Sequence, residues 1–165
     1  MTADTPLDPQ NSTDFRTVMA QYPTGVCAIT SLSQDGAPLA MVVGTFSSVS
    51  LDPPLVGFFP AKTSSTWPLL AATGGFCVNV LALDQQALCR KLATKGEDRF
   101  AGVSWRPAPS GAPILEGVVA WIDCSIEQIT EAGDHDLVLG RVCAMGVDTD
   151  HPPLLFLRGG YGQMT

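Results

Sequence analysis

The stretch from residue 42 to residue 59, VVGTFSSVSLDPPLVGFF, places the tightest limits on how this chain can fold. Before the turn, the hydroxyl-bearing Thr45, Ser47, Ser48 and Ser50 stand among apolar side chains, as in a half-solvated β-strand, and after the turn the run is apolar. Between the halves stands Leu51-Asp52-Pro53-Pro54. Aspartate favours the start of a turn, and proline cannot continue a hydrogen-bonded ladder. The stretch therefore predicts two strands joined by a tight turn.

A second segment, Lys62-Thr63-Ser64-Ser65-Thr66-Trp67-Pro68, follows shortly after. It combines one cation, four hydroxyl groups and an aromatic ring with the expected start of a helix, capped by Ser64 or Ser65. A hydroxyl-lined strand followed by a cation at a helix N-terminus can hold a flat, phosphorylated ligand. An ordinary β-hairpin explains the same spacing, so these residues alone leave both interpretations open.

The remaining chain predicts more strands and a few short helices. Strands are expected over residues 25–32, 37–50, 55–59, 76–82, 115–129, 136–147 and 154–157, and helices over about 14–22, 64–73 and 84–95. The apolar runs are nearly continuous, so both faces of the sheet are covered or the sheet closes on itself. We therefore expect a mainly β fold, a small antiparallel barrel with peripheral helices. A doubly wound sheet would need regular strand–helix alternation, which the chain lacks after residue 115.

The first expected helix carries an apolar stripe. Phe15, Val18, Met19 and Tyr22 have the spacing of one helix face, which predicts that this face packs against the body. We expect Thr13 or Asp14 to cap the helix. Residues 1–11 are expected to form a flexible tail, which leaves residues 12–165 as a single domain.

Composition excludes several classes of protein. The net charge is −7 and the nine cations form no basic run, which argues against nucleic-acid binding. No apolar run is long enough to span a membrane, and the polar, acidic N-terminus does not resemble a signal peptide. Only 15% of the residues are charged, which favours a homo-oligomer that hides apolar surface.

The cysteines and histidines narrow the chemistry further. Five cysteines without a C-x-x-C pair indicate buried free thiols in a reducing cytoplasm rather than disulfides or a metal site. His151 is expected at the surface, and Asn79 as a hydrogen-bonded amide in the core. His135, between Asp134 and Asp136, could hold an anionic ligand. Motifs of hydrolases and nucleotide-binding loops are absent, so we expect the protein to bind and orient a cofactor that reacts.

Six motifs, in this order and spacing, resemble the flavin reductase family: FSSVSLDPPLV, KTSSTWP, GFCVNVL, DRFAGVSW, GDHDLVLGRV and RGGYG. These are the short-chain NAD(P)H:flavin oxidoreductases that supply reduced flavin to two-component monooxygenases. The resemblance covers nearly all of residues 14–162. It implies an FMN-binding split β-barrel of antiparallel, Greek-key type and a homodimer. It also implies FMN or FAD as the flavin, NADH or NADPH as the hydride donor, and a monooxygenase partner.

The resemblance further implies which residues meet the cofactors. The implied flavin contacts are Val42, Val43, Gly44, Thr45, Ser47, Ser48, Ser50, Lys62, Thr63, Ser64, Ser65, Thr66, Trp67, Arg99 and Phe100. The implied nicotinamide contacts are His135, Arg158, Gly159, Gly160 and Tyr161. Lys62 and the hydroxyls after it would hold the flavin phosphate, while Arg99 and Phe100 would close over the flavin. No metal and no side-chain acid or base is required, because hydride passes directly between stacked rings.

The chain departs from the family pattern at one place. Many members carry Thr-Ala-Asn-Ser where this chain has Val42-Val43-Gly44-Thr45. Side-chain hydrogen bonds at positions 42 and 44 are lost, although Gly44 allows a closer approach of the ring. One alternative is therefore a flavin carrier or sensor without turnover. Another is a split-barrel flavoenzyme that acts directly on an organic substrate in a pocket lined by Trp67, Phe100 and Trp121.

Overall fold

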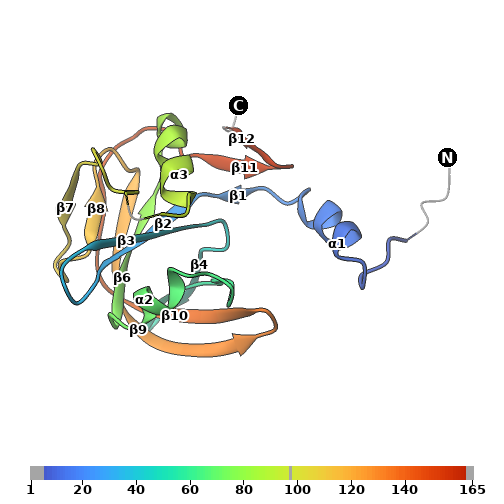
Figure 1. Cartoon of the computed structure of the whole chain (residues 1–165), viewed down its shortest axis with the longest axis horizontal. Coiled ribbons are helices and arrows are strands. Elements are labelled where there is room, and N and C mark those ends of the chain that lie inside the picture. The colour runs from blue at the N-terminus through green and yellow to red at the C-terminus, as the bar shows by residue number, and fades with distance from the viewer. Residues whose placement is uncertain (1–5, 97, 163–165) are drawn as a thin grey trace.

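The computed structural model describes residues 6–96 and 98–162, and Figure 1 shows a strand-rich body with one helix standing apart from it. The elements follow in the order α1 (Ser12–Met19), β1 (Thr24–Gly25), β2 (Cys27–Leu32), β3 (Pro38–Val43), β4 (Ser47–Leu51), β5 (Pro54–Phe58), α2 (Trp67–Ala71), β6 (Gly75–Val80), a 3-10 turn η1 (Leu83–Gln85), α3 (Gln86–Ala93), β7 (Trp105–Pro107), β8 (Pro113–Leu115), β9 (Ala120–Ala132), β10 (His135–Val147), β11 (Leu155–Leu157) and β12 (Gly160–Gly162).

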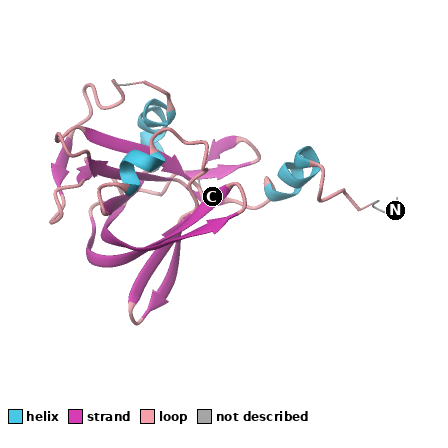
Figure 2. Ribbon diagram, turned by 60° about the horizontal axis from the view of Figure 1, so that its bottom comes forward, coloured by secondary structure: helices cyan, strands magenta, loops and turns pink. Residues whose placement is uncertain are grey.

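The central sheet has seven strands in the order β3-β2-β6-β9-β10-β5-β4, and its neighbours pair antiparallel. Its two edge strands, β3 and β4, are consecutive in the chain and are joined by residues 44–46. The barrel is therefore split along a seam between these edges. The Thr45 hydroxyl accepts a hydrogen bond from the Phe59 amide at 3.0 Å beside this seam. The predicted mainly β, antiparallel split barrel with peripheral helices is confirmed (Figure 2).

The prediction of one strand over residues 37–50 is wrong, because the chain passes from one edge of the sheet to the other at Gly44. A Cβ atom added to Gly44 would lie 2.8 Å from the Thr24 Oγ1 atom. The chain thus leaves β3 while packed closely against β1. The predicted strand over 115–129 starts later, at Ala120, because Gly117 has a φ of +81° that interrupts extended backbone.

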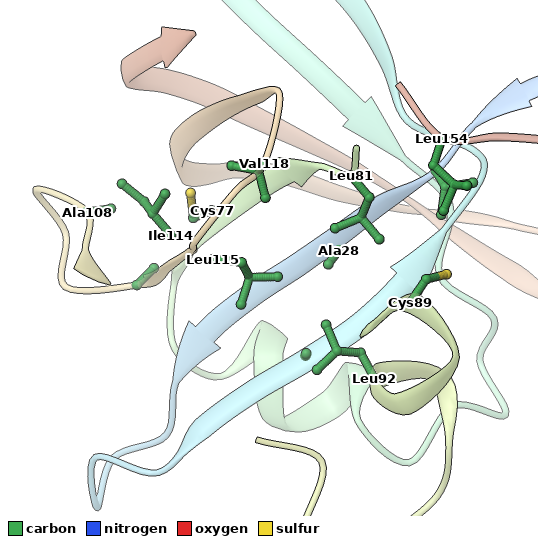
Figure 3. Close-up of a cluster of buried hydrophobic side chains, with 13 residues drawn as sticks. Ala28, Cys77, Leu81, Cys89, Leu92, Ala108, Ile114, Leu115, Val118 and Leu154 are labelled. Atoms are coloured by element: carbon green, nitrogen blue, oxygen red, sulfur yellow. The ribbon is translucent and has the colours of Figure 1, made fainter. Parts of the chain in front are cut away.

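The core lies on both faces of the central strands. In β2, Ala28 belongs to the cluster drawn in Figure 3, where Cys89 and Leu92 of α3 pack against the sheet. Its neighbours Cys27 and Ile29 belong to a second cluster, around Phe58 and other aromatic residues. Alternate residues of one strand point to opposite faces, so β2 is covered on both sides, as the continuous apolar runs predict.

Asn79 is the predicted core amide, and it is fully buried. Its side-chain nitrogen donates to the Thr30 Oγ1 atom at 3.0 Å and to the Pro113 carbonyl at 3.2 Å. Its side-chain oxygen accepts from the Leu115 amide at 2.8 Å. These bonds attach β8 to the sheet and satisfy a polar group that would be costly to bury alone.

Helix α1 does not pack against the body of its own chain, so that prediction is wrong. Its stripe is exposed, with Phe15 at 55%, Val18 at 54%, Met19 at 50% and Tyr22 at 69%. Asn11, rather than Thr13 or Asp14, caps the helix by accepting from the backbone amides of residues 13 and 14. The expected tail of residues 1–11 falls partly outside the described residues, since the description starts at residue 6.

Candidate functional site

A cavity of about 410 Å³ lies beside the seam of the barrel, within the size range of small-molecule sites. Four segments and two single side chains form its wall. They are residues 41–45, residues 59–61, residues 63–66, residues 92–96, Arg99 and His135. The cavity thus brings together the end of β3, the hydroxyl-rich loop and the end of α3, three segments far apart in the sequence.

One part of the cavity wall is lined by apolar residues. Met41, Val42 and Val43 come from the end of β3, while Phe59 and Pro60 face it from the segment after β5. Gly44 and Thr45 complete this wall with backbone and a hydroxyl. Such a surface suits an aromatic ring system, because the ring loses water on its faces and finds backbone hydrogen-bond groups at its edge.

The hydroxyl-rich loop, residues 61–66, forms another part of the cavity wall through Ala61 and residues 63–66. The Ser64 hydroxyl accepts from the backbone amides of Thr66, at 3.3 Å, and Trp67, at 3.2 Å, but the N-cap of α2 is Thr66, so the predicted cap at Ser64 or Ser65 is wrong. Thr63 and Ser65 are exposed and line the cavity. Helix α2 has only five residues, against the nine or ten predicted. If this wall holds an anion, hydroxyl groups and side-chain charges rather than a long helix dipole would have to bind it.

Two cations line the cavity, Lys95 and Arg99. The guanidinium of Arg99 donates to the Ala40 carbonyl at 3.1 Å, to the Leu92 carbonyl at 3.4 Å and to the Thr66 hydroxyl at 2.9 Å. Arg99 thereby joins β3, α3 and the hydroxyl-rich loop. Lys95 was not among the predicted site residues. A signal for it existed, since it is one of only nine cations and stands at the end of the helix expected over about 84–95.

Lys62 lies elsewhere than predicted. Among the described residues, it is not part of the cavity wall, and its ammonium group pairs with the Glu131 carboxylate at 3.2 Å. The Lys62 amide donates to the Asp134 carbonyl at 3.0 Å, which lays this part of the loop along the turn between β9 and β10. Glu131 near that turn therefore attracts the lysine, through an exposed pair of small energetic value.

His135, at the start of β10, lines the cavity. This position is compatible with the prediction that it holds an anionic ligand. Its Nδ1 atom lies 2.7 Å from the Asp134 Oδ1 atom. This hydrogen bond, followed by the charge of His135, lowers the pKa of Asp134 below its ordinary value. The carboxylate stays ionised at neutral pH and engages the Nδ1 atom of the imidazole, so Nε2 is the ring nitrogen that could meet a ligand.

Phe156 of β11 and Tyr161 of β12 line a second, smaller cavity. Tyr161 and Phe156 enclose a space of about 180 Å³ together with Thr24, Val26 and residues 42–44. Arg158 instead holds the end of α1: its amide donates to the Ala20 carbonyl at 3.1 Å and its Nε atom to the Gln21 side chain at 2.7 Å. Of the predicted nicotinamide contacts, His135 lines the larger cavity and Tyr161 the smaller one, and both cavities share residues 42–44. Arg158, Gly159 and Gly160 line neither of the two.

The other predicted contacts lie outside the larger cavity. Among the described residues, its wall lacks Ser47, Ser48, Ser50, Trp67, Phe100, Arg158, Gly159, Gly160 and Tyr161. The three serines belong to edge strand β4. Trp67 is buried in one core cluster, whereas Phe100 and Trp121 pack against the other. The structure therefore does not assemble the pocket of Trp67, Phe100 and Trp121 that was considered for an organic substrate.

Four cysteines are buried free thiols as expected, but Cys143 is exposed. It lies at a register shift of β10, between Val142 and Ala144, where a bulge turns the extra side chain outward. Within the described ranges, no cluster of histidine, cysteine and carboxylate side chains could hold a metal ion. In the same ranges, no helix has the length and hydropathy needed to span a membrane.

The chain is a split antiparallel barrel with a cavity at its seam that apolar residues and hydroxyl groups line together, an arrangement suited to a flat cofactor. The sequence model described as "Flavin reductase like domain" matches residues 19–165, and the chain belongs to this family of oxidoreductases. The predicted family is therefore confirmed.

Three relatives show how close the similarity is. A flavin reductase from Pseudomonas putida is 51% identical over 156 residues, which cover 94% of this chain and 90% of that protein. The reductase subunit HsaB of a flavin-dependent monooxygenase from Rhodococcus jostii is 44% identical, with 94% and 77% covered. The NADH:FAD oxidoreductase SgcE6 from Streptomyces globisporus, solved in complex with NAD and FAD fragments, has a TM-score of 0.91 at 32% identity, and 98% of each chain is covered.

Proposed function

We propose that this chain is an NAD(P)H-dependent flavin reductase that binds FMN or FAD in the cavity of about 410 Å³ and supplies reduced flavin to a monooxygenase. The observation that carries the proposal is the pairing of an apolar wall at the end of β3 with a loop of hydroxyl groups and two cations. The relatives support it, because they include a flavin reductase and the reductase subunit of a monooxygenase.

The residues present fit a flavin phosphate ester. Hydroxyl groups of Thr63, Ser64 and Ser65 can donate to phosphate oxygens, and Lys95 and Arg99 can supply positive charge beside them. Lys62 remains a candidate contact only if it leaves Glu131. The apolar residues at the end of β3 suit the ring, while the backbone of residues 42–45 can supply hydrogen bonds that side chains at 42 and 44 do not.

The protein's task in the reaction is to position the two reactants. A bound flavin supplies a ring that takes hydride directly from a nicotinamide. The hydroxyl-rich loop fixes one end of the flavin, and the β3 wall fixes the plane of its ring. His135 stands at the cavity wall, where its Nε2 atom can bind the nicotinamide dinucleotide, and Tyr161 lies across residues 42–44. Rate enhancement then comes from proximity and orientation rather than from a side-chain acid or base.

We also propose a homodimer in which α1 covers a second copy of the chain. The four apolar residues of its stripe are exposed, and the bonds of Arg158 to Ala20 and Gln21 attach the segment after the helix to the turn between β11 and β12. Exposed apolar side chains also occur on the body, including Val49, Leu51, Met145 and Val147. A surface and its complement on one chain favour a symmetric pair. The five free cysteines support a cytoplasmic location.

Hydroxyl substitutions on the two sides of the seam test the binding site. We expect the double change Thr63→Val and Ser65→Ala to raise the FMN dissociation constant about tenfold or more, since each lost bond to a charged group is worth on the order of 1.5 kcal/mol. The matched control is Ser47→Ala with Ser48→Ala on β4, outside the cavity, and it should change FMN affinity less than about twofold. Equal losses from both pairs would place the flavin elsewhere.

A further inference from the structure

The hydroxyl-rich loop, residues 61–66, is attached to the start of β10 at both of its ends. At the first end, Ala61 forms a β-bridge with His135, and the Asp136 amide donates to the Pro60 carbonyl at 3.0 Å. At the second end, the Trp67 indole Nε1 atom donates to the Asp136 Oδ2 atom at 2.8 Å. One residue of β10, Asp136, therefore holds the segment before the loop by its backbone and the segment after it by its side chain.

Trp67 gives this attachment a firm base in the core. Its side chain is 4% exposed and meets the fully buried Phe58 ring edge-to-face, with ring centroids 5.9 Å apart. A buried indole N–H needs an acceptor, and Asp136 supplies one. The backbone amide of Trp67 also donates to the Ser64 hydroxyl at 3.2 Å. The position of Trp67 therefore helps to fix the position of the Ser64 hydroxyl in the cavity wall.

Neighbouring residues of a strand point to opposite sides, so two consecutive residues of β10 can contact different parts of the site. His135 lines the cavity, whereas Asp136 reaches the indole behind the loop. The register of β10 therefore sets the position of His135 and the position of the hydroxyl groups together. Arg99 adds a third attachment through its 2.9 Å bond to the Thr66 hydroxyl.

We propose that Asp136 is a positioning residue for the phosphate end of the flavin, acting through Trp67. This inference rests on the proposed flavin site. The bond between Asp136 and Trp67 holds the loop in the conformation that presents its hydroxyl groups to a phosphate, so the ordering cost is met before the ligand arrives. Asp136 itself does not touch the ligand. Its effect should therefore appear only with ligands that carry a phosphate.

The test compares FMN with riboflavin, which has the same ring and no phosphate. We expect Asp136→Ala and Trp67→Phe each to raise the FMN dissociation constant about tenfold, the effect of losing one bond to a charged acceptor, with riboflavin changed less than about twofold. Asp136→Asn keeps an acceptor for the indole and should stay within about threefold of the unchanged protein for FMN. The double change Asp136→Ala with Trp67→Phe should weaken FMN binding no more than the worse single change.

Thermal unfolding of every variant shows which proteins are folded at the assay temperature, and Asp136→Asn and Trp67→Phe keep the test decisive if Asp136→Ala does not fold. Equal losses for FMN and riboflavin, or no loss for FMN, would overturn the inference. An Asp136→Asn variant that binds FMN more tightly would also overturn it, because the charge of Asp136 and not its hydrogen bond would then matter. Failure of the unchanged protein to bind either compound would instead refute the proposed function.

Discussion

Gly44 shows how one small residue shapes both the barrel and the cavity. Its position leaves no room for a side chain, because an added Cβ atom would meet the Thr24 hydroxyl at 2.8 Å. Packing against Thr24 therefore explains why this chain has glycine at position 44, where the family pattern has asparagine. The sequence alone suggested that Gly44 allows a closer approach of the flavin ring, and the structure shows a close approach by the Thr24 side chain.

Substitution of Gly44 tests this packing. We expect Gly44→Ala to lower the free energy of unfolding by about 1–3 kcal/mol, the usual cost of an added methyl group in a tight site. Urea unfolding measures it. In a Thr24→Ala background the hydroxyl is gone, and the same substitution should cost less than about 0.5 kcal/mol, since the two effects are coupled. A cost that is the same in both backgrounds would show that Thr24 is not the obstacle.

The cysteines differ sharply in their environments. Burial raises the pKa of Cys27 and Cys77 to about 12, and it raises the pKa of Cys124 as well. Their neutral form is thus favoured by folding. The stability gained is fully present below the ordinary thiol pKa of 9.0 and is lost as the pH rises from there towards 12. Cys143 is exposed and free.

A thiol-reactive dye such as DTNB distinguishes these groups at pH 8. We expect one thiol per chain to react rapidly, because Cys143 is exposed and the four buried thiols are inaccessible to the dye. Cys143→Ser should remove the rapid phase and leave the slow phase, which accompanies unfolding. A rapid phase that survives this substitution would show that one of the buried cysteines is accessible.

Among the strands and helices, long apolar runs were predictable and short connecting pieces were not. Residues 76–82 and 136–147 were predicted as strands and correspond to β6 and β10. Strands such as β7, β8 and β12 have three residues each, and β7 and β8 contain proline. Their pairing depends on distant partners, so local periodicity carries no signal for them.

Helix α1 was predicted as a helix, but its surroundings were not. An apolar stripe indicates that one face of the helix is buried by something, but it does not indicate whether its own chain or another molecule buries it. In the structure the stripe is exposed, and Arg158 attaches the segment after the helix to the turn between β11 and β12 through its bonds to Ala20 and Gln21. The residue has a φ of +51°, unusual for a side chain other than glycine, as the tight turn between β11 and β12 requires.

Polar substitutions on α1 test its proposed role in the dimer. We expect Phe15→Ser with Val18→Ser to convert a dimer into a monomer, measured as mass by light scattering during gel filtration. The control, Thr13→Ser with Thr17→Ser, changes the opposite face of the same helix and should leave the dimer intact. A dimer that survives the apolar substitutions would remove α1 from the interface.

For the chain as a whole, the sequence predicted many residues that line the larger cavity, but it did not predict which of the named residues would lie elsewhere. Residues 42–45, residues 63–66, Arg99 and His135 were named in advance, and all line one cavity. Lys62 and Tyr161 were named with them and lie apart, one paired with Glu131 and one lining the smaller cavity. Which side of a loop a residue faces depends on the strands beside it, here the turn from β9 to β10, and sequence spacing does not encode this.

Anaerobic mixing of the purified protein with FMN and NADH tests the central claim directly. The account predicts that the visible absorbance of oxidised flavin disappears at a rate proportional to protein concentration, with one NADH or NADPH consumed for each flavin reduced. It also predicts that the Thr63→Val and Ser65→Ala variant needs more FMN to reach the same rate. Nicotinamide left unoxidised in the presence of FMN or FAD, with the flavin remaining yellow, would contradict it.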